Sequence, residues 1–316
     1  MGRYAAQRAA QAAVLLLLVS LVGYAMMSLA PGGPTAVYLH NPQVTPDRID
    51  LLRQQLGLDR PWYLRYAGWL WGLLGGHWGY SYYTGRPVLS MIGERLPATV
   101  VLMLSAFALA IVLAFPLGIL AATHKYSWGD NLLSFGSFFV WAMPTFWFGL
   151  MLQMTLAVRW RLFPVAGMHE IGGGSALDLL RHLAMPAVVL GVGSVASWSR
   201  YLRSSLLEAL GQDYVRTAQA KGLPRARVLN HHVLRNSLIP VITIMGLDLH
   251  VLFSGAVITE SIFGWPGMGR LFLSALNNRD YPLQMAGLMI SGALLIGGNL
   301  LADLAYAALD PRVRYR

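Results

Sequence analysis

The sequence predicts an all-α, polytopic membrane protein with six transmembrane helices. Only 12% of its 316 residues are charged and 56% are hydrophobic, whereas an average soluble domain has about 25% charged residues. Several long stretches contain no Asp, Glu, Lys or Arg, and about 20 apolar residues are enough for a helix to cross a bilayer. We therefore expect lipid to surround most of the chain.

The six predicted spans are apolar stretches, taken in chain order, and only the fifth is interrupted by charged residues, Asp248 and Glu260. They lie from Arg8 to the turn at 31–34, between Arg95 and Lys125, between Asp130 and Arg159, between Arg181 and Arg200, after Arg235, and from Asp280 to Asp303. Pro116, Pro144 and Pro186 fall inside the second, third and fourth stretches, where a proline predicts a kink.

The first span has an alternative interpretation as a signal peptide. It begins with the basic residues Arg3 and Arg8 and ends in Ser28-Leu29-Ala30, which could serve as a cleavage site. However, its apolar run is longer than that of a typical signal peptide, and five further spans follow. These two features favour a retained transmembrane helix.

The formal net charge of +10 is placed mainly around the predicted spans, so membrane lipid is a more plausible partner than nucleic acid. Basic residues are enriched in short cytoplasmic loops of membrane proteins. With the N-terminus inside, the cytoplasmic segments hold Arg3, Arg8, Lys125, the dense set from Arg200 to Arg235, and Arg312, Arg314 and Arg316. We therefore expect both termini in the cytoplasm.

The long loop after the first span predicts two short helices. One begins at Thr45-Pro46-Asp47 and stops at Gly57. The second follows Pro61 and carries the aromatic residues Trp62, Tyr63, Tyr66, Trp69 and Trp71. Such aromatics favour anchoring at the membrane interface, and substrate binding is the alternative.

The stretch from Arg200 to Asn236 predicts a short capped helix between two spans. Gly211 permits a break, and Asp213 places a carboxylate in the first turn, where it suits the helix dipole. Lys221 supplies a cation to the last turn, and Gly222 followed by Pro224 is typical of a helix end. The pattern fits either a lever for another protein or an ordinary solvated loop.

A family resemblance distinguishes these two interpretations. Glu208-Ala209, with Gly222 further on and Leu238-Ile239-Pro240 at the end, resembles the EAA loop of binding-protein-dependent ABC transporter permeases. The run EALGQDYVRTAQAKG is similar to the B-type subunits of the dipeptide, oligopeptide and nickel branch. Further similar segments are LGLDRPW at 56–62, GRPV at 85–88, LPAT at 96–99, ESIFGWPGMGR at 260–270, RDYP at 279–282 and LDPR at 309–312.

The chain departs from the family pattern at two places in its outer part. Gly33 stands in the turn after the first span, where the family often has an acidic residue. Gly76-His77-Trp78-Gly79 replaces a common pattern with Gly-Asp before a Leu-Gly or Phe-Gly pair. These departures concern details of the outer loop.

The resemblance implies a type I ABC importer permease fold in a bacterial cytoplasmic (inner) membrane. It implies four kinds of partner: a second homologous permease subunit, two ABC ATPase subunits, an extracytoplasmic substrate-binding protein and membrane lipid. The implied substrates are short peptides first and nickel or a nickel chelate second. The implied ATPase-coupling residues are Glu208, Ala209, Gly211, Asp213, Tyr214, Arg216, Ala218, Ala220, Lys221 and Gly222.

The expected domain organisation follows from the spans and the resemblance. Residues 1–30 form an N-terminal transmembrane helix, and 31–95 form an extracytoplasmic loop with short interfacial helices. Residues 96–306 form the permease core, with five transmembrane helices and the cytoplasmic coupling loop at 200–236. Residues 307–316 form a cytoplasmic tail.

The sequence contains no phosphate-binding loop, because that motif requires Gly-Lys followed by Ser or Thr. Its two lysines, Lys125 and Lys221, are not preceded by glycine. We therefore expect this chain to be no enzyme and to hold no cofactor, with ATP and Mg bound by the partner ATPase subunits. The histidines are scattered and cysteine is absent, which predicts no metal site.

Two acidic residues lie within or at the end of the fifth span. Charge inside a bilayer is costly and usually functional, so Asp248 and Glu260 are candidates for the pore or its gate. For Glu260 the alternative is that it orders the glycine-rich outer loop by hydrogen bonding.

Two other classes of function stay open at this point. An ion-gradient-driven secondary transporter would also have six spans and no phosphate-binding loop. A membrane-embedded enzyme is disfavoured because the sequence has no local catalytic motif.

Overall fold

The computed structural model describes residues 2–31, 33, 35, 46–55 and 57–309. Within these residues the chain forms helices and turns, with an isolated β-bridge between Tyr80 and Pro87 and no strand. The predicted all-α class is therefore confirmed. Some predictions fall outside the described residues: Gly32 and Pro34 of the first turn, the helix start at Thr45, Leu56 of the resemblance, and 310–316 of the tail.

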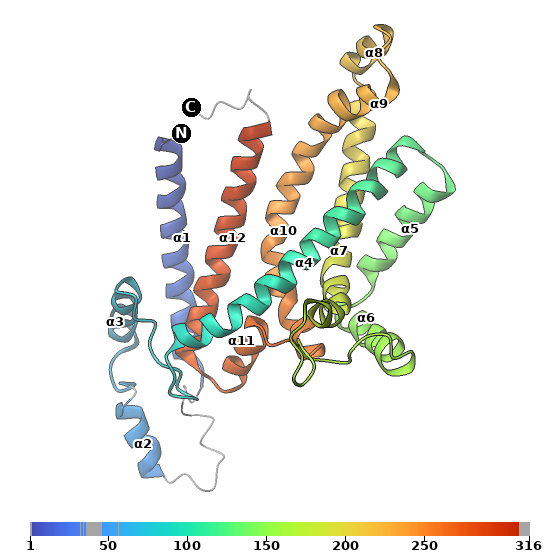
Figure 1. Cartoon of the computed structure of the whole chain (residues 1–316). Coiled ribbons are helices and arrows are strands. Elements are labelled where there is room, and N and C mark those ends of the chain that lie inside the picture. The colour runs from blue at the N-terminus through green and yellow to red at the C-terminus, as the bar shows by residue number, and fades with distance from the viewer. Residues whose placement is uncertain (1, 32, 34, 36–45, 56, 310–316) are drawn as a thin grey trace. The chain divides into compact units, whose positions relative to one another are not determined.

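The chain divides into two compact units, Met1–Ala98 with Gly267–Leu294, and Thr99–Pro266 with Leu295–Arg316. The first unit contains α1 (Gly2–Leu29), α2 (Pro46–Gln55), α3 (Trp62–Leu74), α11 (Met268–Asn277) and the first half of α12 (Tyr281–Leu309) (Figure 1). The predicted loop helices after Thr45 and Pro61 are therefore confirmed. Gly57 stops the first of them with a positive φ of 63°.

Aromatic packing holds α3 against α1 in the first unit. The ring of Tyr24 lies 5.5 Å from that of Tyr66 and 6.0 Å from that of Trp69. The hydroxyls of Ser20 and Tyr66 form a hydrogen bond of 3.0 Å. Part of the predicted aromatic set therefore packs on the first span, whereas Trp71 stays 80% exposed.

The second unit is a helical bundle centred on α7. It contains most of α4 (Val88–Thr123), α5 (Trp128–Ala142), α6 (Thr145–Leu152), the π-helix η2 (Gln153–Arg159), α7 (Ala176–Leu210), α8 (Asp213–Ala220), α9 (Arg225–Arg227), the π-helix η3 (Val228–Val233) and α10 (Leu234–Ile262). Helix α7 packs against α5, α6 and α10 (Figure 1). Its side chains Trp198, Leu202 and Leu206 are fully buried in the main core cluster.

Four helices in the described part of the chain are long and apolar enough to cross a membrane: α1 from Ala10 to Leu29, α4, α7, and α12 from Tyr281 to Gly298. The pair formed by α5 and the segment Thr145–Arg159, which corresponds to the third predicted span, could supply one more crossing and is bent by 102°. The break lies at Met143 and Pro144, which confirms the predicted kink in the third span. The count of six spans stays a prediction.

Two glycines let α4 and α7 approach closely. A Cβ atom on Gly191 would lie 2.8 Å from the carbonyl oxygen of Ala106, and one on Gly118 would lie 2.8 Å from that of Ser199. Backbone atoms cannot move aside as a flexible side chain can. Small residues at such crossings are how membrane helices pack without larger gaps.

Replacing Gly191 with alanine is expected to destabilise the protein by about 1 to 3 kcal/mol, because the new methyl group overpacks the crossing with α4. Thermal unfolding of the purified protein in detergent measures the change. Gly193→Ala on the same helix is the matched control, since a Cβ there meets nothing within 4 Å. Equal unfolding temperatures for the two variants would show that the close approach does not matter.

Candidate functional site

Helix α8 ends in a Schellman motif built around Gly222. The N–H of Gly222 donates to the carbonyl of Gln219 at 2.9 Å, and the N–H of Leu223 donates to that of Ala218 at 3.4 Å. Gly222 has a φ of 75°, a region that favours glycine. Lys221 is the C-cap residue, one position beyond the last turn in which the sequence placed it.

Helix α8 has one buried and one exposed face. Val215 and Ala218 are 1% and 6% exposed, and they belong to the same core cluster as Leu206, Val228 and Val233. The base of α8 is therefore continuous with the packing that surrounds α7, η3 and α10. Because protein interiors are close-packed, α8 is held in place by its contacts with this cluster.

The structure separates the predicted coupling residues into two groups. Ala209 and Ala218 are buried and pack the base of the helix. The exposed residues are Glu208, Gly211, Asp213, Tyr214, Arg216, Ala220, Lys221 and Gly222. The exposed group forms the surface that a partner could contact.

The end of α7 at Gly211 does not require the backbone conformations that only glycine adopts easily. Its φ and ψ are −80° and −8°, an ordinary right-handed conformation. A Cβ atom at this position would meet the carbonyl oxygen of Glu208 at 3.5 Å, which is a normal contact distance. Among the glycines around α8, therefore, only Gly222 is required by its backbone conformation.

An ion pair fastens α5 to the end of α7 that leads into α8. Arg203 donates through Nε and Nη2 to the two carboxylate oxygens of Asp130, the second at 2.7 Å. The backbone N–H of Tyr126 also donates to Asp130, at 2.9 Å. The carboxylate is 2% exposed. In the sequence Asp130 is recognisable only as the border of a predicted span, and no local pattern connects it with Arg203.

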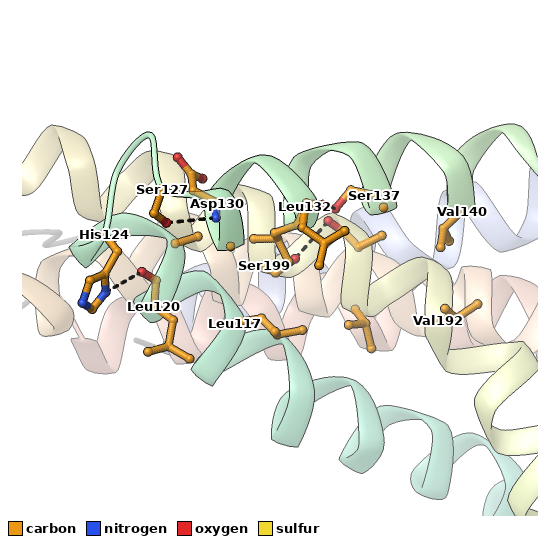
Figure 2. A pocket seen from close by; sticks show the side chains of 16 residues that line it. Leu117, Leu120, His124, Ser127, Asp130, Leu132, Ser137, Val140, Val192 and Ser199 are labelled. Carbon is orange, nitrogen blue, oxygen red and sulfur yellow. Dashed lines mark hydrogen bonds between the residues drawn. The ribbon is translucent and has the colours of Figure 1, made fainter.

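A cavity of about 510 Å³ lies between α4, α5 and α7, with an almost wholly apolar lining. Figure 2 shows Leu117, Leu132, Val140 and Val192 along its length. His124, Ser127 and Asp130 lie at one end. The Ser127 hydroxyl accepts from the N–H of Asp130 at 3.3 Å and caps α5. The cavity therefore lies beside the Asp130–Arg203 ion pair.

Asp248 lies on α10 and binds to the centre of α7. The indole N–H of the fully buried Trp198 donates to its carboxylate at 2.6 Å. Asp248 also lines a cavity of about 270 Å³ that includes Met143 and Thr145, on either side of the α5–α6 bend. Asp248 therefore lies inside the helical bundle, and its role in the pore stays a prediction.

Glu260 lies at the end of α10 and is fully buried. The hydroxyl of Thr99 on α4 donates to its carboxylate at 2.6 Å. Its backbone carbonyl accepts from the N–H of Trp265 at 2.9 Å, in the loop that follows α10. Glu260 thus holds α4, α10 and this loop together, and the sequence did not reveal Thr99 as its partner.

In the first unit, Asp280 of the RDYP segment is 2% exposed and binds the loop before α4. The hydroxyl of Ser81 donates to its carboxylate, and the backbone N–H of Tyr82 donates to it at 3.0 Å. The sequence marked Asp280 as the start of the sixth predicted span and as part of a resemblance, but it did not reveal these partners. The structure shows the contact that this carboxylate makes.

The described residues contain no group of three or more His, Cys, Asp or Glu side chains that could hold a metal ion. The membrane-spanning helices and the exposed helix α8 together indicate the class of protein. The chain has several helices that are long and apolar enough to cross a membrane, and it presents the capped helix α8 beyond the ends of α7 and α10 (Figure 1).

Comparison with known proteins identifies the family within this class. A model described as a binding-protein-dependent transport system inner membrane component matches residues 114–315, and the corresponding N-terminal model matches residues 1–103. The chain therefore belongs to the family of binding-protein-dependent transport system inner-membrane permeases. In this family the permease is not catalytic, and ATP is hydrolysed by a separate subunit.

Similar proteins cover almost the whole chain. The oligopeptide transport system permease protein AppB of Bacillus subtilis is 40% identical over 317 residues and covers 100% of both chains. The dipeptide transport system permease protein DppB of Escherichia coli K12 is 36% identical and covers 94% of both. These relatives favour the main prediction over the nickel and ion-gradient alternatives.

A solved structure supports the fold. The crystal structure of an amino acid ABC transporter with histidines matches with a TM-score of 0.50 at 13% identity. The match covers 71% of this chain and 95% of that one. The predicted permease fold is therefore confirmed at the level of overall architecture.

Replacing Arg203 with alanine is expected to lower the free energy of unfolding by about 1 to 3 kcal/mol, because Asp130 then remains buried without its cation. Denaturant unfolding in detergent measures this loss. The control is Arg216→Ala, which removes an exposed partner of Asp213 and should leave stability unchanged. A stability of Arg203→Ala equal to that of the control would contradict a structural role for the ion pair.

Proposed function

We propose that this chain is the permease subunit of an ATP-driven peptide importer and that α8 is its coupling element. The observation that carries the proposal is the geometry of α8. The helix has an exposed polar face, a fixed C-terminal stop and a base that belongs to the core of the bundle. Such a helix can transmit a force from a partner protein to the helical bundle without bending.

The proposed substrates are short peptides, delivered by an extracytoplasmic binding protein. The support for this class is the full-length similarity to permeases named for oligopeptides and dipeptides. Peptide uptake into proteoliposomes that contain the complete transporter and ATP tests it directly. Uptake should require the binding protein and stop when ATP is replaced by a non-hydrolysable analogue.

The proposed assembly has a second homologous permease and two ABC ATPase subunits, which bind ATP and Mg. Both termini of this chain lie in the cytoplasm, which places α8 on the same side as the ATPases. The concentration of basic residues from Arg200 to Arg235 supports this orientation. Cysteine residues introduced near either terminus should react only with membrane-permeant reagents.

The proposed cycle is alternating access driven by ATP. Closure of the ATPases moves α8, and the packed base of α8 passes the movement to α7 and α10. ATP shifts the equilibrium because it binds one state of the assembly more tightly than the other. Asp248 faces the translocation path, and Glu260 holds the element at the outer end of α10 that opens and closes.

Gly222→Val is expected to leave insertion and assembly intact but to lower ATP-driven uptake severalfold. Valine disfavours the positive φ of this position, so the end of α8 must rearrange although a Cβ meets nothing within 4 Å. Uptake and ATPase activity, measured on the same proteoliposomes, report uncoupling as hydrolysis without transport.

Gly211→Ala is the matched control for this experiment, because its backbone conformation suits alanine. It should transport normally. Undiminished uptake by Gly222→Val would remove α8 from the coupling role. Uptake that needs no ATPase subunit and is abolished by an ionophore would instead indicate the ion-gradient class.

Asp248→Asn is expected to assemble normally and to transport poorly. The amide oxygen can still accept the indole N–H of Trp198, so the fold is retained while the negative charge is lost. Initial uptake rates at several peptide concentrations measure the effect. Unchanged transport by an assembled Asp248→Asn transporter would exclude a role for this charge in the pore.

A further inference from the structure

A separate cavity lies within the first unit. Its volume is about 270 Å³, and residues of α1, α3, the loop before α4 and the start of α12 surround it. The polar groups that matter for its chemistry are those of Arg60, Arg65, Tyr24, Tyr82 and Tyr281. None of the functional proposals above uses these residues.

Two donors of this cavity are buried and unsatisfied. The Nε–H group of Arg65 and the hydroxyl of Tyr281 find no hydrogen-bond partner in the part of the chain that the structure describes. Buried polar groups in folded proteins almost always have a partner. Two such donors at one cavity therefore indicate an acceptor that comes from outside the chain.

The charges around the cavity specify what kind of acceptor fits. Arg65, Tyr24, Tyr82 and Tyr281 line the same cavity, and the guanidinium of Arg65 interacts electrostatically with the three tyrosines. Arg60 adds a second cation, and the described residues that line the cavity include no Asp or Glu. The nearby Asp280 already accepts from Ser81 and from the N–H of Tyr82.

The phenol of Tyr82 stays protonated in this environment. Burial, as the largest cause, raises its pKa to about 12. It is therefore a neutral hydrogen-bond donor at physiological pH. Together with the arginines, the cavity offers donors and positive charge, which suit an anionic group with several oxygen atoms.

We propose that this cavity binds the phosphate group of a membrane phospholipid. Arginine is well suited to phosphate because its planar donors match the oxygen geometry. The source is lipid because α1 exposes Val22, Met26 and Leu29 along its length, at 56%, 68% and 78%. Met27, Leu64 and Met285 give the cavity an apolar wall for the start of an acyl chain.

Such a lipid would fasten three elements of the first unit that are far apart in sequence. Its phosphate oxygens would accept from Arg65 on α3 and from Tyr281 on α12, beside Tyr24 on α1. The cavity is lined by several tyrosines and by Trp69, and both residue types are enriched at the membrane–water interface. The proposal rests on the membrane location of the chain and does not depend on the substrate it transports.

The test uses the complete transporter, delipidated in a phosphate-free detergent. Phosphatidylglycerol, diacylglycerol and inorganic phosphate are added separately, and the shift in unfolding temperature is followed together with bound lipid by native mass spectrometry. We expect a saturable shift with phosphatidylglycerol alone. Diacylglycerol tests whether the phosphate is needed, and inorganic phosphate tests whether the lipid chains are needed.

Tyr281→Phe and Arg65→Gln are expected to raise the lipid concentration for a half-maximal shift about tenfold or more, because each removes a hydrogen bond to a charged group. Arg53→Gln is the control, since Arg53 is an exposed residue of α2 outside the cavity. Tyr281→Phe removes a single oxygen, so it keeps the test valid if Arg65→Gln does not fold.

Three results would overturn the proposal. The first is the absence of a lipid-dependent shift in the wild type. The second is an equal shift in the wild type, Tyr281→Phe and the control. The third is a full shift with inorganic phosphate or with diacylglycerol, because the cavity would then hold a free anion or an acyl chain alone.

Discussion

The packing of α7 against α10 is the contact on which the other features of the second unit depend. Trp198, Leu202 and Leu206 fill the space between these helices and α4 without exposure to solvent. At one level of this contact the indole of Trp198 holds Asp248. At one end the same cluster continues into Val215 of α8 and Val233 of η3. One continuous core therefore supports both the exposed helix and the embedded acid.

Buried carboxylates act as fasteners between elements that are distant in sequence. Asp130 joins α5 to α7 through Arg203, and Glu260 joins α10 to α4 through Thr99. Within the first unit, Asp280 joins the start of α12 to Ser81. A buried charge is costly without partners, so each acid specifies its own pairing. Apolar contacts alone are not directional and do not specify which helices pair. The buried carboxylates supply this specificity.

The sequence predicted those features that depend on local signals. Gly222 and Pro224 marked the end of α8, and Pro61 marked the start of α3, because caps and breaks are decided by neighbouring residues. The contacts of the buried carboxylates were not predictable from the sequence. Asp130 and Arg203, for example, are 73 positions apart, and neither stands in a distinctive pattern. The sequence also could not separate the buried Ala218 from its exposed neighbours, because only the packing against Val228 and Val233 makes that distinction.

The continuity of the core also determines where movement can occur. A close-packed interface moves as a body or changes between discrete arrangements, and it does not deform gradually. In the proposed cycle, a displacement of α8 would therefore be carried along α7 and α10 as far as their packing is unbroken. The helical frame of this unit is interrupted at Met143 and Pro144, where α5 and α6 are bent by 102°. Proline has no N–H to continue the hydrogen-bond ladder, so Pro144 donates no hydrogen bond back into α5. Asp248 lines the cavity at this bend. In the proposed cycle, Asp248 therefore lies where the close-packed core meets this break, and a movement that begins at α8 would change its surroundings there.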